Sequence, residues 1–452
     1  MHATLRRITT MLAALGAGHA AHAQLMQDFK LTPDDLSSVD YFGFSVAVSG
    51  STVLVGSRLD DDGGLNSGSA YLFDATTGQQ LFKLTADDAA KDDEFGYAAA
   101  ISGANAIVGA RTDDLAGINS GSVYVFDTAT GQQRFKLIAN DAMAGDFFGI
   151  DVALSGTTAI IGASGDDDIG SGSGSAYLFD VATGQQLHKL VPRDGWINDR
   201  FGLSVAISGT TAIVGAFLDD DAGTDSGSAY LFDTATGQEL FKLTANDGAP
   251  DDQFGRAVAI SGTTAVVGAW QNDEQGVWAG AAYVFDTTTG QQRFKLTADD
   301  ADVLDNLGNA VAVSGTTAIV GAPGHGVGGA AYAFDTTTGQ QLFKIIADDT
   351  ALPDAFGHAV ALAGSTVVVG AYRAGAAPEF THAGSAYVFT PCPGACNGAD
   401  LAEPYCTIDF DDIDAFVAAF VAGDPEGDCD GSGALNFDDI DCFVAAFLAG
   451  CP

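Results

Sequence analysis

The chain has 452 residues, of which 59 are acidic and 18 are basic, and its formal net charge is −41. This charge excludes nucleic acid as a partner, because phosphate binding requires lysine and arginine, and it disfavours anionic membrane surfaces. After the first 23 residues no segment is long and apolar enough to cross a bilayer, so we expect no transmembrane segment in the mature chain.

Residues 1–23 have the features of a secretory signal peptide. Arg6 and Arg7 form a basic start, an apolar stretch follows, and Ala21-His22-Ala23 forms an Ala-x-Ala cleavage site. The apolar stretch is too short to span a bilayer as a mature helix. We therefore expect cleavage after Ala23 and an exported protein that is either secreted or held at the cell surface.

Seven similar copies follow within residues 24–390. Phe-Gly recurs at 42, 95, 148, 201, 254 and 356, with Leu-Gly at 307. Each copy contains four short runs rich in Val, Ile, Tyr, Phe and Thr, bounded by Gly, Ser, Asp or Asn, which are typical of strands and turns. No 12-residue window before residue 408 has a helical period. Four strands in each of seven copies predict an all-β fold, a seven-bladed β-propeller.

The two ends of this region predict how the ring closes. The seventh copy has its first three strands, ending at Ala386-Tyr-Val-Phe389, but lacks the fourth. The missing strand is found at the other end of the chain, as Asp28-Phe-Lys-Leu-Thr32 before the first Phe-Gly. We expect this N-terminal strand to complete the last blade and so close the propeller.

The repeated Phe-Gly-x-Ser-Val-Ala and Gly-Thr-Thr-Ala-Ile-Val-Gly-Ala units resemble FG-GAP repeats, the blades of integrin-α-type propellers. The resemblance covers residues 27–389 and implies the same propeller fold. Integrin-type blades that bind calcium do so in an Asp-x-Asp-x-Asp-Gly loop between the first and second strands. Here that connection is a short Ser-Gly-Thr-Thr turn without a carboxylate, so the family's calcium ligands do not carry over.

The remaining loops are long and acidic. Loops between the second and third strands, and loops between copies, emerge on one face of such a propeller, which we call the long-loop face. Binding residues tend to lie on loops carried by a rigid scaffold. The acidic residues there either satisfy turn backbones or form weak calcium sites, and the candidate metal ligands are Asp60, Asp61, Asp62, Asp166, Asp167, Asp168, Asp219, Asp220 and Asp221.

Other side chains on this scaffold are also candidates. One lysine recurs in every fourth strand, either as an outward charge that blocks edge-to-edge pairing or as part of a positive ligand ring: Lys30, Lys83, Lys136, Lys189, Lys242, Lys295 and Lys344. Trp196, Trp270 and Trp278 fall in long-loop segments and are candidate ligand-binding residues, for example by stacking on sugars. His325, His358 and His382, with Arg373, are the alternative candidates for a catalytic group.

Residues 391–452 form a different, duplicated domain. A Phe-Asp-Asp-Ile-Asp helix pattern begins at Phe410 and returns at Phe437. Before the second helix, oxygen donors have the spacing of an EF-hand loop. We therefore expect a Ca²⁺ site formed by Asp428, Asp430, Ser432, the carbonyl of Ala434, Asn436 and Asp439.

All six cysteines lie in this tail, and in an exported segment they predict disulfides, with zinc as the alternative. Sequence alone leaves the pairing open among Cys392, Cys396, Cys406, Cys429, Cys442 and Cys451. Paired calcium loops with helices resemble dockerin domains, and the Ala-Gly-Cys-Pro ending is similar to cysteine-terminated dockerin-like tails of bacterial exported proteins. The resemblance implies a small α-helical, calcium-binding domain that anchors the chain to a cell-surface partner.

Together these features predict a non-catalytic binding or adhesion propeller for an extracellular protein or glycan, displayed through a calcium-loaded tail. Near-uniform copies argue against an enzyme, because catalysis needs a unique constellation of residues. The alternatives are a propeller polysaccharide lyase or hydrolase, which would use a carboxylate pair or the histidines, and a purely structural surface protein.

Overall fold

The computed structural model describes residues 25–351, 353–375 and 382–391. The predicted signal peptide, the EF-hand loop and the six cysteines lie outside the described residues. Within them the chain contains 28 strands and no helix, so no described helix is available to cross a membrane. Residues Gln27–Thr390 form one compact unit.

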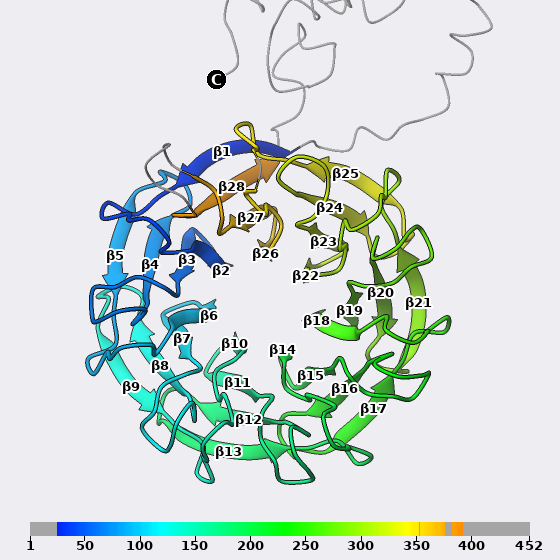
Figure 1. The fold of residues 1–452 in the computed structure, drawn as a ribbon, viewed down its shortest axis with the longest axis horizontal. Helices are drawn as coiled ribbons and strands as arrows, with labels where there is room; N and C mark the ends of the chain where they lie inside the picture. Colours follow the sequence, from blue (N-terminus) through cyan, green and yellow to red (C-terminus); the bar gives the residue numbers. More distant parts are fainter. Residues whose placement is uncertain (1–24, 352, 376–381, 392–452) are drawn as a thin grey trace, which may run out of the picture. The chain divides into compact units, whose positions relative to one another are not determined.

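The strands form seven four-stranded sheets around a common axis, which confirms the predicted seven-bladed propeller (Figure 1). The innermost strands are β2 (Phe42–Ser49), β6 (Phe95–Ser102), β10 (Val152–Ser155), β14 (Ser204–Ser208), β18 (Phe254–Ser261), β22 (Ala310–Ser314) and β26 (Ala359–Ala363). The second strands are β3 (Thr52–Ser57), β7 (Asn105–Ala110), β11 (Thr158–Ala163), β15 (Thr211–Ala216), β19 (Thr264–Ala269), β23 (Thr317–Ala322) and β27 (Thr366–Ala371).

Third and fourth strands continue each blade outward. The third strands are β4 (Ser69–Asp74), β8 (Ser122–Asp127), β12 (Ser175–Asp180), β16 (Ser228–Asp233), β20 (Ala281–Asp286), β24 (Ala330–Asp335) and β28 (Ser385–Pro391). The outermost strands are β5 (Gln80–Leu84), β9 (Gln133–Leu137), β13 (Gln185–Leu190), β17 (Glu239–Leu243), β21 (Gln291–Leu296), β25 (Gln341–Ile345) and β1 (Leu25–Leu31). In the first blade, Val55 of β3 lies opposite Val46 of β2 and Tyr71 of β4, in antiparallel register.

The hydrophobic core lies between neighbouring blades. Second and third strands are covered on both faces, and for this reason they read as continuous apolar runs rather than alternating ones. Between the first two blades, for example, buried Leu54 and Leu72 share a cluster with Val108 and Phe126. The outermost strands have one face open and alternate accordingly.

The phenylalanine of Phe-Gly packs inside its own blade. Phe95 meets Tyr124 and Phe126 of β8 edge-to-face, with ring centroids 5.4 and 5.8 Å apart. The same arrangement recurs in every blade except the sixth, where Leu307 takes the place of the phenylalanine.

The predicted closure is confirmed. The last sheet has the order β1-β28-β27-β26, so the N-terminal strand is the outermost strand of the seventh blade (Figure 1). Leu31 is buried in the cluster shared with the first blade. Lys30 pairs with Asp349, and the side-chain oxygen of Gln27 accepts the backbone N–H of Asp348 at 3.1 Å. The strand begins at Leu25, a few residues earlier than the sequence predicts.

Removal of residues 25–31 is therefore expected to open the ring. The deletion exposes the edge of β28 and uncovers the core around Leu31. We expect thermal unfolding at least about 10 °C below that of a control chain that begins at Gln24 and keeps the strand. Differential scanning calorimetry of the two proteins decides the point, and equal melting temperatures would disprove closure by β1.

Candidate functional site

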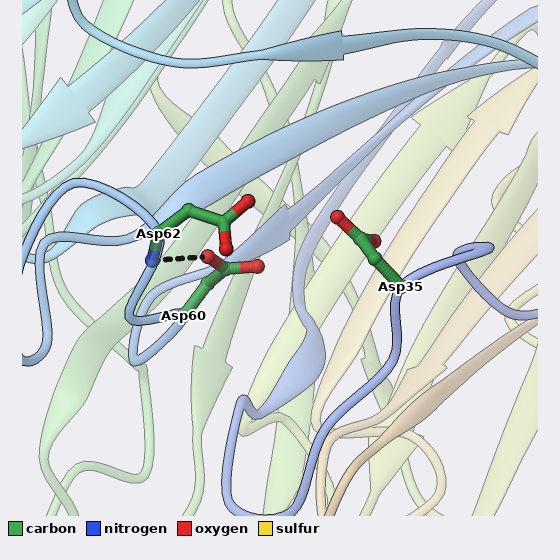
Figure 2. Close-up of side chains that lie close together, drawn as sticks. All are labelled: Asp35, Asp60 and Asp62. Atoms are coloured by element: carbon green, nitrogen blue, oxygen red, sulfur yellow. Dashed lines mark hydrogen bonds between the residues drawn. The ribbon is translucent and has the colours of Figure 1, made fainter.

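The long-loop face carries one lysine–carboxylate cluster per blade. In the first blade Lys83 Nζ lies 2.6 Å from Asp35 and 3.1 Å from Asp60, and it also pairs with Asp62. The Tyr71 hydroxyl donates to Asp60 at 2.8 Å. Figure 2 shows the three carboxylates converging on one space.

The recurring lysines lie on the outermost strands and are ion-paired with loop carboxylates, which the sequence did not predict. Lys189, for example, has only 18% of its side chain exposed and contacts Asp141 at 2.7 Å and Asp166 at 2.9 Å, as well as Asp168. Although burial opposes the charge, the hydrogen bonds that the Lys189 ammonium donates to these carboxylates hold its pKa above the usual value. The clusters pin the outermost strand of each blade to the loops of the long-loop face. The role of the lysines in blocking edge-to-edge pairing remains a prediction.

The three carboxylates of each predicted Asp triplet have different partners. The first carboxylate accepts the backbone N–H of the third residue, for example Asp168 to Asp166 at 3.0 Å, which is the predicted turn role. The second accepts a backbone N–H five residues on, as Asp167 does from Gly172 at 2.6 Å. In all three triplets the third carboxylate pairs with the lysine, so Asp62, Asp168 and Asp221 already face a cation. Calcium binding by Asp60–Asp62, Asp166–Asp168 or Asp219–Asp221 therefore remains a prediction that has to displace a lysine.

A second set of aspartates lies buried just before Phe-Gly. The carboxylate of Asp40 accepts the backbone N–H of Ser37 at 2.6 Å. Burial, with the charge of neighbouring triplet carboxylates, raises to about 6 the pKa of Asp40, Asp93, Asp146 and Asp199. In the fifth blade the triplet position holds Asn272, whose amide donates to Asp252 at 3.1 Å. In the fifth blade the neutral amide of Asn272 therefore occupies the position at which the first four blades have a second carboxyl group beside the buried aspartate.

The centre of the ring holds a cavity of about 300 Å³. Every blade contributes to its wall through the three residues that follow Phe-Gly, such as Phe44, Ser45 and Val46 in the first blade. The first of these three we call the axial position. The axial residues are Phe44, Tyr97, Ile150, Leu203, Arg256, Asn309 and His358.

The copies differ around this opening as well as in the long loops. Two further positions also change from blade to blade, and in four blades one of them contacts the axial residue, as Arg58, Arg111, Trp270 and Tyr372 do. Together with the axial positions we call them the axial mouth. The residues directly before Phe-Gly are Tyr41, Glu94, Phe147, Arg200, Gln253, Asn306 and Ala355. Those directly after the second strand are Arg58, Arg111, Ser164, Phe217, Trp270, Pro323 and Tyr372. The flanking Phe-Gly and Gly-Ala pairs are nearly the same in all copies, so each variable position of the mouth lies directly beside a nearly constant pair.

One side of the mouth is a layer of arginines and aromatic rings. Glu94 accepts hydrogen bonds at 2.9 Å from both Arg58 and Arg111. The Arg58 guanidinium lies 4.5 Å from the ring centroid of Phe44, and that of Arg111 lies 3.9 Å from Tyr97. Glu94 and the aromatic rings together hold both guanidinium groups in place.

Charged groups also line the channel itself. Burial and the charges of Arg256, Arg58 and Arg373 lower the pKa of His358 to about 3, so this imidazole is neutral. Burial raises the pKa of Asp151 to about 7. Arg256 lies 5.5 Å from the ring of Trp270, and burial lowers the pKa of its guanidinium. Positive charge is thus gathered at the axis of a strongly acidic protein.

The predicted tryptophans do not form one site. Trp270 lies at the mouth, where its Nε1–H donates to Gln253 at 2.6 Å. Trp196 and Trp278 are 71% and 43% exposed on the long loops, and within the described residues no ring contact joins the three. Their role in ligand binding remains a prediction.

Of the predicted catalytic candidates only His325 lies apart. Arg373 lies 5.0 Å from the ring of Tyr372, and the ring of Tyr41 lies 5.1 Å from that ring and 6.3 Å from the ring of His382. His358 lines the channel, 4.4 Å from the ring of Tyr372. His325 lies in the sixth lysine cluster, where it contacts Asp305 at 2.8 Å and Lys344 at 2.6 Å. The sequence did not predict the roles of Arg58, Arg111 and Arg256, although the residue after Phe-Gly differs in all seven copies and was a usable signal for Arg256.

The lysine clusters generate a calcium prediction. Substitution Lys189→Ala leaves three converging carboxylates without their cation, so we expect a loss of about 2–3 kcal/mol in the free energy of unfolding. Millimolar calcium should restore part of this loss, giving the variant a larger calcium-dependent rise in Tm than the parent chain. Lys91→Ala, at an exposed pair with Asp92, is the control and should change neither quantity. Equal calcium responses of parent and Lys189→Ala would contradict the assignment of the lysine as the resident cation.

The buried aspartates generate a pH prediction. The pKa of Asp93 is about 6 in the folded chain and 3.8 in the unfolded chain. Its protonated form therefore stabilises the fold fully below about pH 3.8, and this contribution is lost as the pH rises through 6. We expect the free energy of unfolding in urea to fall between pH 5 and 7.5, by about 1–2 kcal/mol for each such group. Asp113→Asn, which copies Asn272, should reduce this slope, and Asp114→Asn should not. A free energy of unfolding that rises between about pH 5 and 7.5 would contradict the raised pKa of these buried aspartates.

Comparison with known families finds seven matches to the FG-GAP repeat, in residues 25–73, 79–126, 132–179, 185–232, 238–285, 291–334 and 340–389. No curated protein matches the chain. FG-GAP repeats are typical of extracellular proteins. The matches cover most of the chain, and there is one for each blade. Each match contains the outermost strand of one blade and the first three strands of the next blade. The chain therefore belongs to the FG-GAP repeat family.

Proposed function

We propose that this protein is an exported, non-catalytic binding protein whose propeller captures an extracellular protein or glycan at the axial mouth. The observation that carries the proposal is that the axial residues, which line a cavity shared by all seven blades, are different in every copy. Seven identical axial residues would form a mouth with sevenfold symmetry. A ligand without that symmetry needs non-equivalent groups around it, and this chain supplies them.

The chemistry of the mouth supports binding rather than catalysis. Its two channel serines, Ser45 and Ser204, donate to the carbonyl oxygens of Gly96 at 2.9 Å and Gly255 at 2.8 Å. Among the described residues of the mouth no hydroxyl is hydrogen-bonded to a histidine, which is the arrangement that activates a serine nucleophile. Neutral His358 instead packs against aromatic rings.

The tail completes the proposal. Its Asp428–Asp439 loop has EF-hand ligand spacing, which supports Ca²⁺ as the bound ion. We propose that the calcium-loaded, dockerin-like domain displays the propeller at the cell surface. In the native host, a chain that ends at Thr390 should then shift from the cell-surface fraction to the medium, and unchanged partitioning would reject the anchoring role.

Blocking the channel tests the binding role of the mouth. Leu203→Trp fills the opening from the fourth blade, whereas Leu240→Trp adds the same bulk on the outermost strand of that blade, where Leu240 is 44% exposed. On arrays of glycans and extracellular matrix proteins, we expect ligands of the parent to lose at least tenfold in affinity with Leu203→Trp and to keep it with Leu240→Trp. Equal binding by the two variants would place the ligand elsewhere.

A further inference from the structure

Arg256 differs from the other arginines of the mouth. Arg58 and Arg111 are engaged by Glu94, whereas within the described residues the Arg256 guanidinium makes no hydrogen bond or ion pair. Its charge does interact with the Asp151 carboxyl in the same channel. Among the described residues, the Arg256 nitrogens do not belong to the solvent-inaccessible atoms that lack a hydrogen bond. Because Arg256 lines the channel, these nitrogens are accessible from it. The ring of Trp270 holds the group in place at 5.5 Å. A fixed guanidinium that lines a cavity and whose N–H groups are not hydrogen-bonded is suited to bidentate pairing with a carboxylate.

The rest of the channel can bind hydroxyl groups. Asp151 accepts backbone N–H groups from Val152 at 2.9 Å and Val205 at 2.7 Å, which leaves lone pairs on both of its oxygens. The Asn309 amide donates to the carbonyl of His358 at 3.0 Å, so its own oxygen stays open. Within the described residues the Tyr97 hydroxyl has no hydrogen-bond partner.

This polar wall narrows the class of anion. An apolar acid, such as a fatty acid, would bury Asp151, Asn309 and Tyr97 without giving them partners, which costs free energy. A polyhydroxylated acid can pair with all three. The volume of about 300 Å³ is at the lower end for ligand pockets, so it suits one or two sugar units rather than a folded partner.

We infer that the channel binds a sugar acid of the uronate type, with its carboxylate on Arg256 and its hydroxyls on Asp151, Asn309 and Tyr97. The inference rests on the proposed function, because the ligand enters through the axial mouth. It narrows the ligand class from glycans in general to acidic ones. A uronate at the end of an extracellular polysaccharide would present this chemistry.

Calorimetric titration of the full chain with galacturonate, galactose and inorganic phosphate tests the inference. We expect galacturonate to bind at least tenfold more tightly than either of the other two. Arg256→Gln should weaken galacturonate at least tenfold, and Tyr97→Phe, which removes only a hydroxyl, should weaken it about fivefold. Arg293→Gln in the same blade is the control, because Arg293 lies on the outermost strand β21, where it pairs with Asp286 of β20. Melting temperatures establish that each variant is folded.

Three results would overturn the inference. They are no binding of galacturonate at millimolar concentration, equal binding of galactose, and unchanged affinity in folded Arg256→Gln and Tyr97→Phe. Tight binding of phosphate would show a general anion site and would equally refute the sugar acid. The proposed binding function is tested separately by Leu203→Trp. If a glycan or protein binds the parent chain and this substitution abolishes the binding, the proposed function holds even where the sugar-acid inference fails.

Discussion

The structure depends on direct contact between the backbones of neighbouring blades. A side chain at Gly56 would place its first carbon 2.0 Å from the carbonyl oxygen of Gly96 in the next blade, and one at Gly96 would lie 2.3 Å from that of Ser69. Parallel bridges link each blade to the next, including Phe42 to Gly384 where the ring closes. Only glycine permits this approach, so Phe-Gly and Val-Gly-Ala recur because the blades cannot otherwise stack.

The same constraint separates scaffold from site. Glycine contacts, the buried phenylalanines and the lysine–carboxylate clusters repeat around the ring, and each contributes to the stability of one blade or of one junction. The residue after Phe-Gly faces the channel and takes no part in those contacts. It is therefore free to differ, and the chain places phenylalanine, tyrosine, arginine, asparagine and histidine there. A strongly acidic protein thus keeps several of its few arginines at its axis.

The fold was predictable because the residue pattern of each copy indicates its strands and turns. The additional strand before Phe42 was also predictable, because the seventh copy lacks its fourth strand. The interior of the long-loop face was not. Lys83 lies between apolar neighbours in the sequence, and nothing local indicates that Asp35 and Asp60, from two different loops, meet it. Arg256 was overlooked for a related reason, since its significance depends on groups from other blades, such as Asp151 and His358, that only ring closure brings together.

The central claim is that stability resides in the glycine contacts and binding in the axial residues. Comparing the melting temperatures of Gly96→Ala and Leu203→Ala tests it most directly. The account predicts that Gly96→Ala lowers Tm by about 10 °C or more, or prevents folding, because a methyl group has no space between the blades. Leu203→Ala at the channel wall should change Tm by less than about 3 °C. A larger effect at Leu203 than at Gly96 would contradict the account.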